Sequence, residues 1–303
     1  MKKFIIRFFI FLVPILIMGV FIEVVTRSIP NEYKYKNNYL NKFSNQIEVL
    51  VLGSSHTYYG INPDYFTLNT FNSAHVSQTV DFDYFILNKF IEDLSSLKVV
   101  IIPISYFSLF SRLEEGLEAY RAKNYTIYYG YKDSNALNYF EVSSGQILKK
   151  IKRIIKYSFF GIDATISKKG FGLSKLKKEP IDYFIKDGKI AATRHSKGKW
   201  ENVVKNKKNI EKIIMLCQKK QIKVIFVTLP AYRSYRENID DERLLYTTNY
   251  LNKVSKTYNN VTYYNFLADA RFVVDDYMNA DHFNSNGAKK LSKIINNLIK
   301  KSS

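Results

Sequence analysis

The chain has 303 residues, of which 46% are hydrophobic, so it can bury a sizeable core and its composition argues against general disorder. Lys and Arg number 46 against 27 Asp and Glu, and the formal charge of +19 favours anionic surroundings such as lipid headgroups, acidic glycopolymers or nucleic acid. The single cysteine, Cys217, excludes an internal disulfide and a cysteine-based zinc site.

The chain opens with residues 4–25, which are almost wholly apolar and long enough to cross about 30 Å of hydrocarbon as a helix. Lys2, Lys3 and Arg7 precede or open this run, and the positive-inside rule then places the N-terminus in the cytoplasm. A cleaved signal peptide is the alternative, although no small-x-small cleavage site follows the run. We therefore expect residues 1–27 to be a retained single-pass anchor of the cytoplasmic membrane, with the remaining chain extracytoplasmic.

Residues 28–46 are polar and are expected to form a juxtamembrane linker in front of a domain spanning 47–303. Short apolar runs bounded by turn residues predict strands, and apolar residues at helical spacing predict helices between them. The expected strands lie within 46–53, 70–79, 98–105, 223–230 and 261–266, and the expected helices within 81–97, 202–220, 240–258 and 289–300. Alternation of this kind predicts a parallel sheet with helices on both faces.

The middle of the chain, residues 107–200, departs from this alternation and is rich in Tyr, Phe and Lys. We expect it to be an insertion or cap over the sheet edge, with 147–160 as a candidate basic amphipathic helix. Its lysines are either a specific binding surface or simply a solvated face. His195 lies in this region among basic residues and is expected at the surface.

The first strand runs into Gly53-Ser54-Ser55, a sequence typical of a sharp turn from a strand into a helix. A serine at such a corner is exposed near a helix N-terminus, where unpaired N–H groups favour developing negative charge. An ordinary N-cap serine is the alternative interpretation. Nucleophilic catalysis at this serine requires an imidazole base elsewhere in the chain.

A candidate base, His282, stands in a polar loop just before the final helix and directly follows Asp281. Acyl transfer through a serine uses an imidazole to take the proton and usually a carboxylate to hold the imidazole in the right tautomer. His56 and His75 also follow strand ends, and each is expected to be either a polar residue lining the pocket or a solvent-exposed side chain. The four scattered histidines do not suggest a metal site, and we expect neither a metal nor a cofactor.

With these pieces the chain resembles the SGNH (GDSL-like) hydrolase superfamily, over residues 46–105 and 200–300. The similarity is greatest to membrane-anchored cell-envelope members, such as the D-alanyl-transfer protein of teichoic acid operons and the alginate O-acetylation proteins. The resemblance implies a flavodoxin-like three-layer sandwich around a parallel sheet of about five strands. It also implies a serine esterase or O-acyltransferase that modifies envelope polysaccharide.

The motifs of that family imply roles for particular residues here. Gly53-Ser54-Ser55 is similar to its Gly-Asp-Ser segment, which makes Ser55 the nucleophile, and His282 the base with Asp281 as orienter. The segment Asn72 to Ser77 is similar to the family's Asn-x-x-x-x-Gly, so the N–H groups of Ser55 and Ser77 are the implied oxyanion donors.

Two positions depart from the family pattern. The third segment lacks the usual oxyanion asparagine, and Ser105 is the residue available to replace it. The family's Asp-x-x-His has Asn279 at the aspartate position, so Asn279 is the alternative orienter and an inactive member stays open. His56, Asn72 and Gln78 are expected to border the substrate.

The partners expected from this interpretation are the membrane, an anionic envelope polysaccharide and a multi-spanning membrane protein that donates the acyl group. A catalytically inactive scaffold that binds polysaccharide or an assembly partner is the alternative function. A basic binder of membrane surfaces or nucleic acid is a third, but no nucleic-acid module is recognisable, and we expect no nucleic-acid partner.

Overall fold

The structure, a computed structural model, describes residues 1–144, 147–161, 164–173 and 179–302. These residues form two compact units, and the larger comprises 38–119 together with the described residues from 165 to the C-terminus. The smaller unit comprises 1–37 and the described residues between 120 and 164.

The larger unit is built on a five-stranded parallel sheet with the strand order β2-β1-β3-β4-β5. The strands are β1 (Val49–Val51), β2 (Thr70–Asn72), β3 (Val99–Pro103), β4 (Lys223–Thr228) and β5 (Val261–Asn265). All residues of β1, β2 and β3 are buried, as expected of strands covered on both faces. The sheet predicted from the apolar runs is thus confirmed, and its order is that of flavodoxin-like folds.

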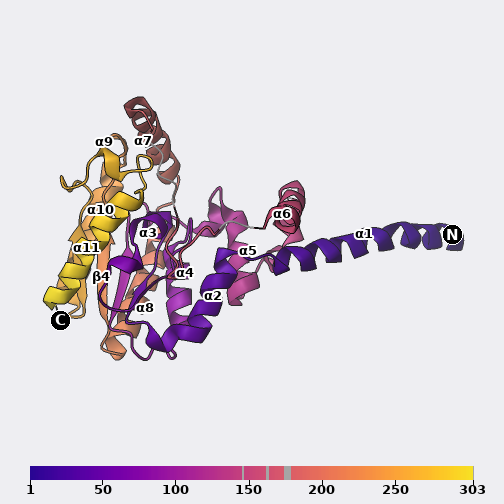
Figure 1. Cartoon of the computed structure of the whole chain (residues 1–303), viewed down its shortest axis with the longest axis horizontal. Helices are drawn as coiled ribbons and strands as arrows, with labels where there is room; N and C mark the ends of the chain where they lie inside the picture. The colour runs from indigo at the N-terminus through magenta and orange to yellow at the C-terminus, as the bar shows by residue number, and fades with distance from the viewer. Residues whose placement is uncertain (145–146, 162–163, 174–178, 303) are drawn as a thin grey trace. The chain divides into compact units, whose positions relative to one another are not determined.

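Helices cover both faces of this sheet (Figure 1). Helix α3 (Ser55–Gly60) packs against α11 (Ser285–Ser302), while α4 (Val80–Phe90) packs against α8 (Asn202–Lys219), and α10 (Asp241–Thr257) packs on β5. Because the chain reverses direction across the sheet after β2, right-handed crossovers place α3 on the face opposite α4 and α8. The result is the three-layer arrangement expected from the sequence.

The remaining helices were predicted less completely. Helix α2 (Glu32–Phe43) occupies most of 28–46, so this segment is helical where a polar linker was expected, and it buries Tyr33 and Leu40. The region 107–200 contains α5 (Ala122–Asn124), the expected α6 (Ile147–Phe160) and α7 (Ile181–His195), which packs on α9 (Arg233–Arg236). Short 3-10 helices lie at Ser44–Gln46, Pro63–Tyr65, Leu113–Glu115, Ala119–Arg121, Ala136–Tyr139, Val142–Ser144 and Val274–Asp276, and a π-helical turn at Tyr125–Tyr129.

The smaller unit carries the N-terminal helix α1 (Lys2–Ser28). An 18-residue window of this helix has a mean hydropathy of 2.8, and no residue in the window is buried. By length and composition α1 can cross a membrane, and a signal sequence would have the same character.

Candidate active site

The corner between β1 and α3 has the strand-turn-helix geometry expected from Gly53-Ser54-Ser55. Gly53 adopts φ +110°, and a side chain there would place its Cβ 2.5 Å from the Thr57 hydroxyl oxygen. Only glycine therefore fits this turn without displacing its neighbours. Ser54 occupies the N-cap position, and Ser55 is the first residue of α3, with its side chain partly exposed.

The buried carboxyl group of Asp83 forms hydrogen bonds that hold this corner. The Gly53 N–H donates to Asp83 Oδ1 at 2.8 Å, and the Gln78 side-chain amide donates to the same oxygen at 2.6 Å. Burial raises the pKa of Asp83 to about 7, although both of these hydrogen bonds favour its ionised form. Next to it, a cavity of about 20 Å³ lined by Gly53, Ser54, Gln78 and Asp83 is no larger than a water site.

Of the three residues expected to border the substrate, His56 is buried, and the other two have structural roles. Gln78 is buried, and its amide holds Asp83. Asn72 is fully buried, and its amide donates to the carbonyl oxygens of Thr57 (3.1 Å) and Ile61 (2.8 Å). The prediction that these polar side chains face the substrate is therefore wrong, because they satisfy buried groups of the fold.

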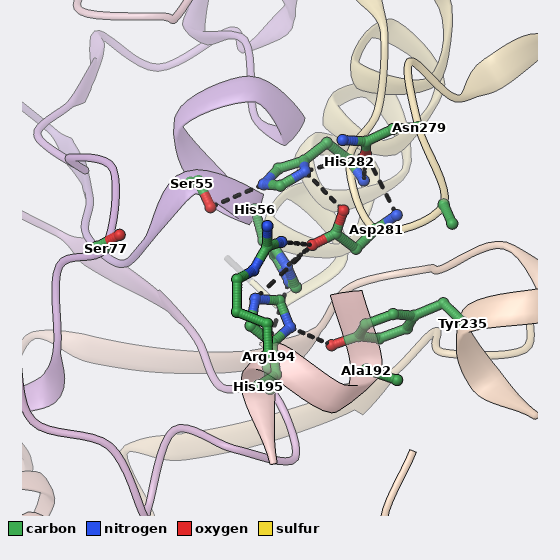
Figure 2. A network of polar contacts seen from close by, with 12 residues as sticks. Ser55, His56, Ser77, Ala192, Arg194, His195, Tyr235, Asn279, Asp281 and His282 are labelled. Atoms are coloured by element: carbon green, nitrogen blue, oxygen red, sulfur yellow. Dashed lines mark hydrogen bonds and ion pairs between the residues drawn. The ribbon is translucent and has the colours of Figure 1, made fainter. Parts of the chain in front are cut away.

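The predicted nucleophile and base lie together although they are far apart in the chain. His282 Nε2 is 2.8 Å from Ser55 Oγ, which is hydrogen-bonding distance (Figure 2). Ser55 comes from the helix after β1, and His282 from the loop between β5 and α11. This loop is held in place by the Met278 N–H, which donates to the His282 carbonyl at 2.9 Å.

The other ring nitrogen of His282 lies close to both candidate orienters. His282 Nδ1 is 3.0 Å from Asn279 Oδ1 and 2.9 Å from Asp281 Oδ1. The amide oxygen of Asn279 also accepts the backbone N–H groups of His282 (2.8 Å) and Asp281 (3.3 Å), so three donors fix its orientation. Asn279 makes the better-directed hydrogen bond, because Asp281 Oδ1 does not meet hydrogen-bond geometry despite the short distance. A proton on Nδ1 leaves Nε2 free to accept the Ser55 hydroxyl.

The carboxylate of Asp281 is buried, and its second oxygen is surrounded by cationic and imidazole groups. Asp281 Oδ2 lies 3.3 Å from Arg194 Nη2, 3.6 Å from His56 Nε2 and 3.7 Å from His195 Nε2. Burial would raise the pKa of the Asp281 carboxyl, but the adjacent His282 and His56 outweigh it and hold the pKa well below its usual range. Asp281 is therefore a stable anion next to the ring of His282.

Arg194 and His195, at the end of α7, are the site residues that the sequence did not reveal. His195 was expected at the surface, but its side chain is only 15% exposed and its Nδ1 lies 2.6 Å from the hydroxyl of Tyr235. That expectation is wrong because α7 packs on α9, which brings His195 onto Tyr235. Burial lowers the pKa of His195 well below its ordinary value, and it also lowers that of His56, so both rings are neutral supports.

The donor atoms of His56, His195 and Asp281 lie within 4.8 Å of one another, which is a spacing compatible with a metal ion. However, Arg194 already donates to the same carboxylate oxygen at 3.3 Å and supplies one compensating positive charge. A divalent cation there would leave excess buried positive charge beside His282. The donor set thus fits a held carboxylate better than a metal centre.

The two serines considered for the oxyanion hole differ. Ser77 has φ +63°, a conformation that glycine adopts easily, which agrees with its place at the glycine of the family segment. Its hydroxyl contacts Glu118. Ser105 is engaged elsewhere: its hydroxyl lies 3.1 Å from His56 Nδ1, and its N–H donates to Ser108 Oγ at 2.9 Å. The expectation that Ser105 replaces the missing oxyanion donor is therefore not supported, and Ser105 instead holds His56.

Comparison with known proteins adds little to this geometry. No family model matches the chain, and no curated protein matches it. Among solved structures, a proposed acylhydrolase from Bacteroides fragilis superposes with a TM-score of 0.44 at 13% identity, over 87% of this chain and 95% of that one. A GDSL-like lipase from Bacteroides thetaiotaomicron gives a TM-score of 0.44 at 13% identity, over 89% and 100%. With TM-scores below 0.5, these similarities assign neither a family nor an activity to the chain.

Proposed function

We propose that the protein is a serine esterase or O-acyltransferase of the SGNH type, anchored in the cytoplasmic membrane by α1 with its catalytic domain outside. The observation that carries the proposal is the 2.8 Å contact between Ser55 Oγ and His282 Nε2. A partly exposed hydroxyl at a glycine corner, paired with an imidazole whose other nitrogen is held, is the arrangement that nucleophilic acyl transfer requires.

In the proposed reaction, Ser55 Oγ attacks the ester carbonyl while His282 Nε2 takes the hydroxyl proton. The backbone N–H groups of Ser55 and Ser77 stabilise the negative charge on the oxygen of the tetrahedral intermediate. His282 then returns the proton to the departing alkoxide oxygen, which leaves an acyl group on Ser55. Water or a sugar hydroxyl attacks this acyl-enzyme with His282 again acting as base, and the product ester or acid departs as Ser55 regains its proton.

Asn279 and Asp281 together perform the role that a single carboxylate usually has in orienting and stabilising the catalytic imidazole. The Asn279 side-chain oxygen accepts a hydrogen bond from the Nδ1–H group and so fixes the tautomer of His282. Asp281 supplies a buried negative charge 2.9 Å from the same nitrogen, which stabilises the imidazolium that forms when Ser55 is deprotonated. The neutral amide at 279 therefore need not abolish catalysis.

The proposed substrate is an acyl group, most simply acetyl, on an anionic polysaccharide of the cell envelope. The excess of basic residues favours a polyanion, and the apolar N-terminal helix favours a location at the membrane. Transfer in that compartment requires a multi-spanning membrane protein that delivers the acyl group from the cytoplasm.

Labelling with a fluorophosphonate probe tests the proposal directly. We expect the wild type to be labelled covalently and Ser55→Ala to be unlabelled, because the probe reacts only with an activated serine. Ser54→Ala is the matched control: it removes the neighbouring hydroxyl from the N-cap and should retain labelling, with equal thermal stability in both variants. Hydrolysis of a chromogenic acetate ester by the same three proteins gives an independent readout.

One observation favours the alternative, a catalytically inactive scaffold that binds polysaccharide. The Ser105 hydroxyl contacts His56, so it does not serve as the side-chain donor of the oxyanion, and loss of one donor typically costs on the order of 100- to 1000-fold in rate. A folded wild type that is neither labelled nor active, with Ser55→Ala unchanged in the cell, would identify the scaffold.

A further inference from the structure

Helix α6 has an unusual composition for a helix at the surface of a folded unit. Its sequence from Ile147 to Phe160 contains five basic residues and no acidic one. A helix of this composition gains nothing from internal ion pairs, and its like charges repel one another. A cationic helix with a strong apolar side is typical of segments that lie on anionic lipid.

The exposed side of α6 carries large apolar side chains. Leu148 is 74% exposed, Ile155 50% and Phe159 77%, and these positions follow at intervals of seven and four residues. At 3.6 residues per turn they lie along one stripe of the helix, and Phe160, 83% exposed, extends its end. We call Leu148, Ile155, Phe159 and Phe160 the apolar stripe. The exposed Lys152 and Lys156 lie along one edge of it.

The opposite side of α6 is tied down, so the stripe has a defined orientation. Lys150 is buried and lies 3.4 Å from the carboxylate of Glu141, which also contacts the ammonium group of Lys123. Arg153 donates to the Pro30 carbonyl at 3.0 Å. Lys150 and Arg153 therefore hold one side of the helix, where Ile154 is also half-buried, while the apolar stripe stays on the outside.

These contacts place α6 beside the C-terminal end of α1, within the same compact unit (Figure 1). The carboxylate of Glu23 accepts the N–H groups of Glu141 (3.0 Å) and Val142 (2.9 Å), just ahead of α6. Pro30, which receives Arg153, follows α1 directly. Where α1 spans a membrane, this end of α1 is the point at which the chain leaves the hydrocarbon.

We propose that α6 is an interfacial helix, with its apolar stripe inserted among the headgroups of an anionic phospholipid membrane at the outer end of α1. Lys152 and Lys156 then lie at the level of the lipid phosphates, and Phe159 and Phe160 lie at the boundary of the acyl chains. The inference rests on the proposed anchoring of α1. A lipid surface fits better than a protein groove because α6 contacts a helix with an apolar window long enough to cross a membrane, and the basic side chains along one edge of the stripe complement anionic headgroups.

The test measures the depth of single cysteine probes in the full-length protein, reconstituted in bilayers of phosphatidylcholine with or without phosphatidylglycerol. Cys217 is buried and its thiol pKa is raised to about 12, so the native cysteine does not compete for labelling. A fluorophore is attached at Phe159→Cys, at Leu16→Cys in the middle of α1 as a deep reference, and at Lys256→Cys on α10 as an aqueous reference. Quenching by lipids that carry a quencher at known depths reports the position of each probe.

We expect the probe at 159 to be quenched about 5–10 Å into the headgroup and acyl boundary, and to be quenched more when phosphatidylglycerol is present. Reversing two charges with Lys152→Glu and Lys156→Glu should reduce this quenching, whereas the matched reversal Lys205→Glu and Lys208→Glu on α8 should leave it unchanged. A probe at 159 that behaves like the aqueous reference, while the probe at 16 is deep, would overturn the inference and leave the anchor intact. Should the probe at 16 also be aqueous, the anchoring fails and the interfacial helix fails with it.

Discussion

His282 and His195 both approach the carboxylate of Asp281, but they are positioned by different kinds of structure. His282 belongs to the loop that contains Asn279 and Asp281, and hydrogen bonds within four consecutive residues set its ring. His195 stands at the end of α7 and is held by Tyr235 of a separate helix. The comparison separates the proposed base, which is positioned locally, from a supporting histidine that is positioned by tertiary packing.

The largest expected effect is a loss of activity caused by a substitution in the loop that positions His282. His282→Gln should lower kcat/KM for a chromogenic acetate ester by about 1000-fold, because a general base of this kind contributes 100- to 10,000-fold. His195→Gln is the matched change in the second region and should keep activity within about 10-fold, since its ring contacts Asp281 and not Ser55. Equal losses in the two variants would contradict the division between reactive and supporting histidine.

A smaller effect separates the two orienters within the loop. Asp281→Asn removes the buried charge and should lower kcat about 100-fold, whereas Asn279→Ala removes one hydrogen bond to Nδ1 and should lower it about 10-fold. Steady-state kinetics on both variants, with circular dichroism to verify folding, would measure the difference. The reverse ranking would show that Asn279 alone orients His282 and that Asp281 serves the supporting region.

The smallest expected effect is a change in the pH dependence of the free energy of unfolding, and it comes from His195. Burial lowers the pKa of His195, so as the pH falls below about 6.5 the unfolded chain takes up a proton before the folded protein does. The contribution of His195 to the free energy of unfolding is thus constant above about pH 7, and it falls as the pH drops below about 6.5.

His195→Gln should remove this contribution, and chemical denaturation of both proteins at pH 5, 6, 7 and 8 measures it. The raised pKa of Asp83 acts in the opposite direction, because its burial costs more as the pH rises toward about 7, but it does so equally in both proteins. The difference between wild type and variant therefore reports the loss of His195 together with its electrostatic effect on His56. Parallel curves for the two proteins across this range would contradict the prediction.

The same contrast explains what could be predicted from the sequence. The five strands were predicted because each is a short apolar run between turn residues, and in a parallel sheet such runs are buried on both faces. Ser55 and His282 could be singled out as candidates because a glycine corner and a loop before the last helix are both local patterns, and the structure places the two side chains in contact.

The supporting residues were not predicted, for physical reasons. Nothing near His195 in the sequence indicates that α7 packs on α9, so its basic neighbours suggested a solvated surface. Asn72 and Gln78 lie at strand ends, where ligand-binding residues also gather, but whether an amide faces a ligand or a buried carbonyl depends on distant backbone. For the same reason Ser105 was expected to act as a donor in the site, although it holds His56.

The position of His56 has a consequence for how a molecule can reach Ser55. In this strand order, ligands enter between the carboxyl ends of β1 and β3, the strands that lead to Ser55 and Ser105. There His56 contacts the Ser105 hydroxyl, and its ring lies edge-on to Phe107 with centroids 5.6 Å apart, so side chains occupy this entrance. Ser55 itself is partly exposed, so access to the proposed nucleophile does not depend on a passage between these strands.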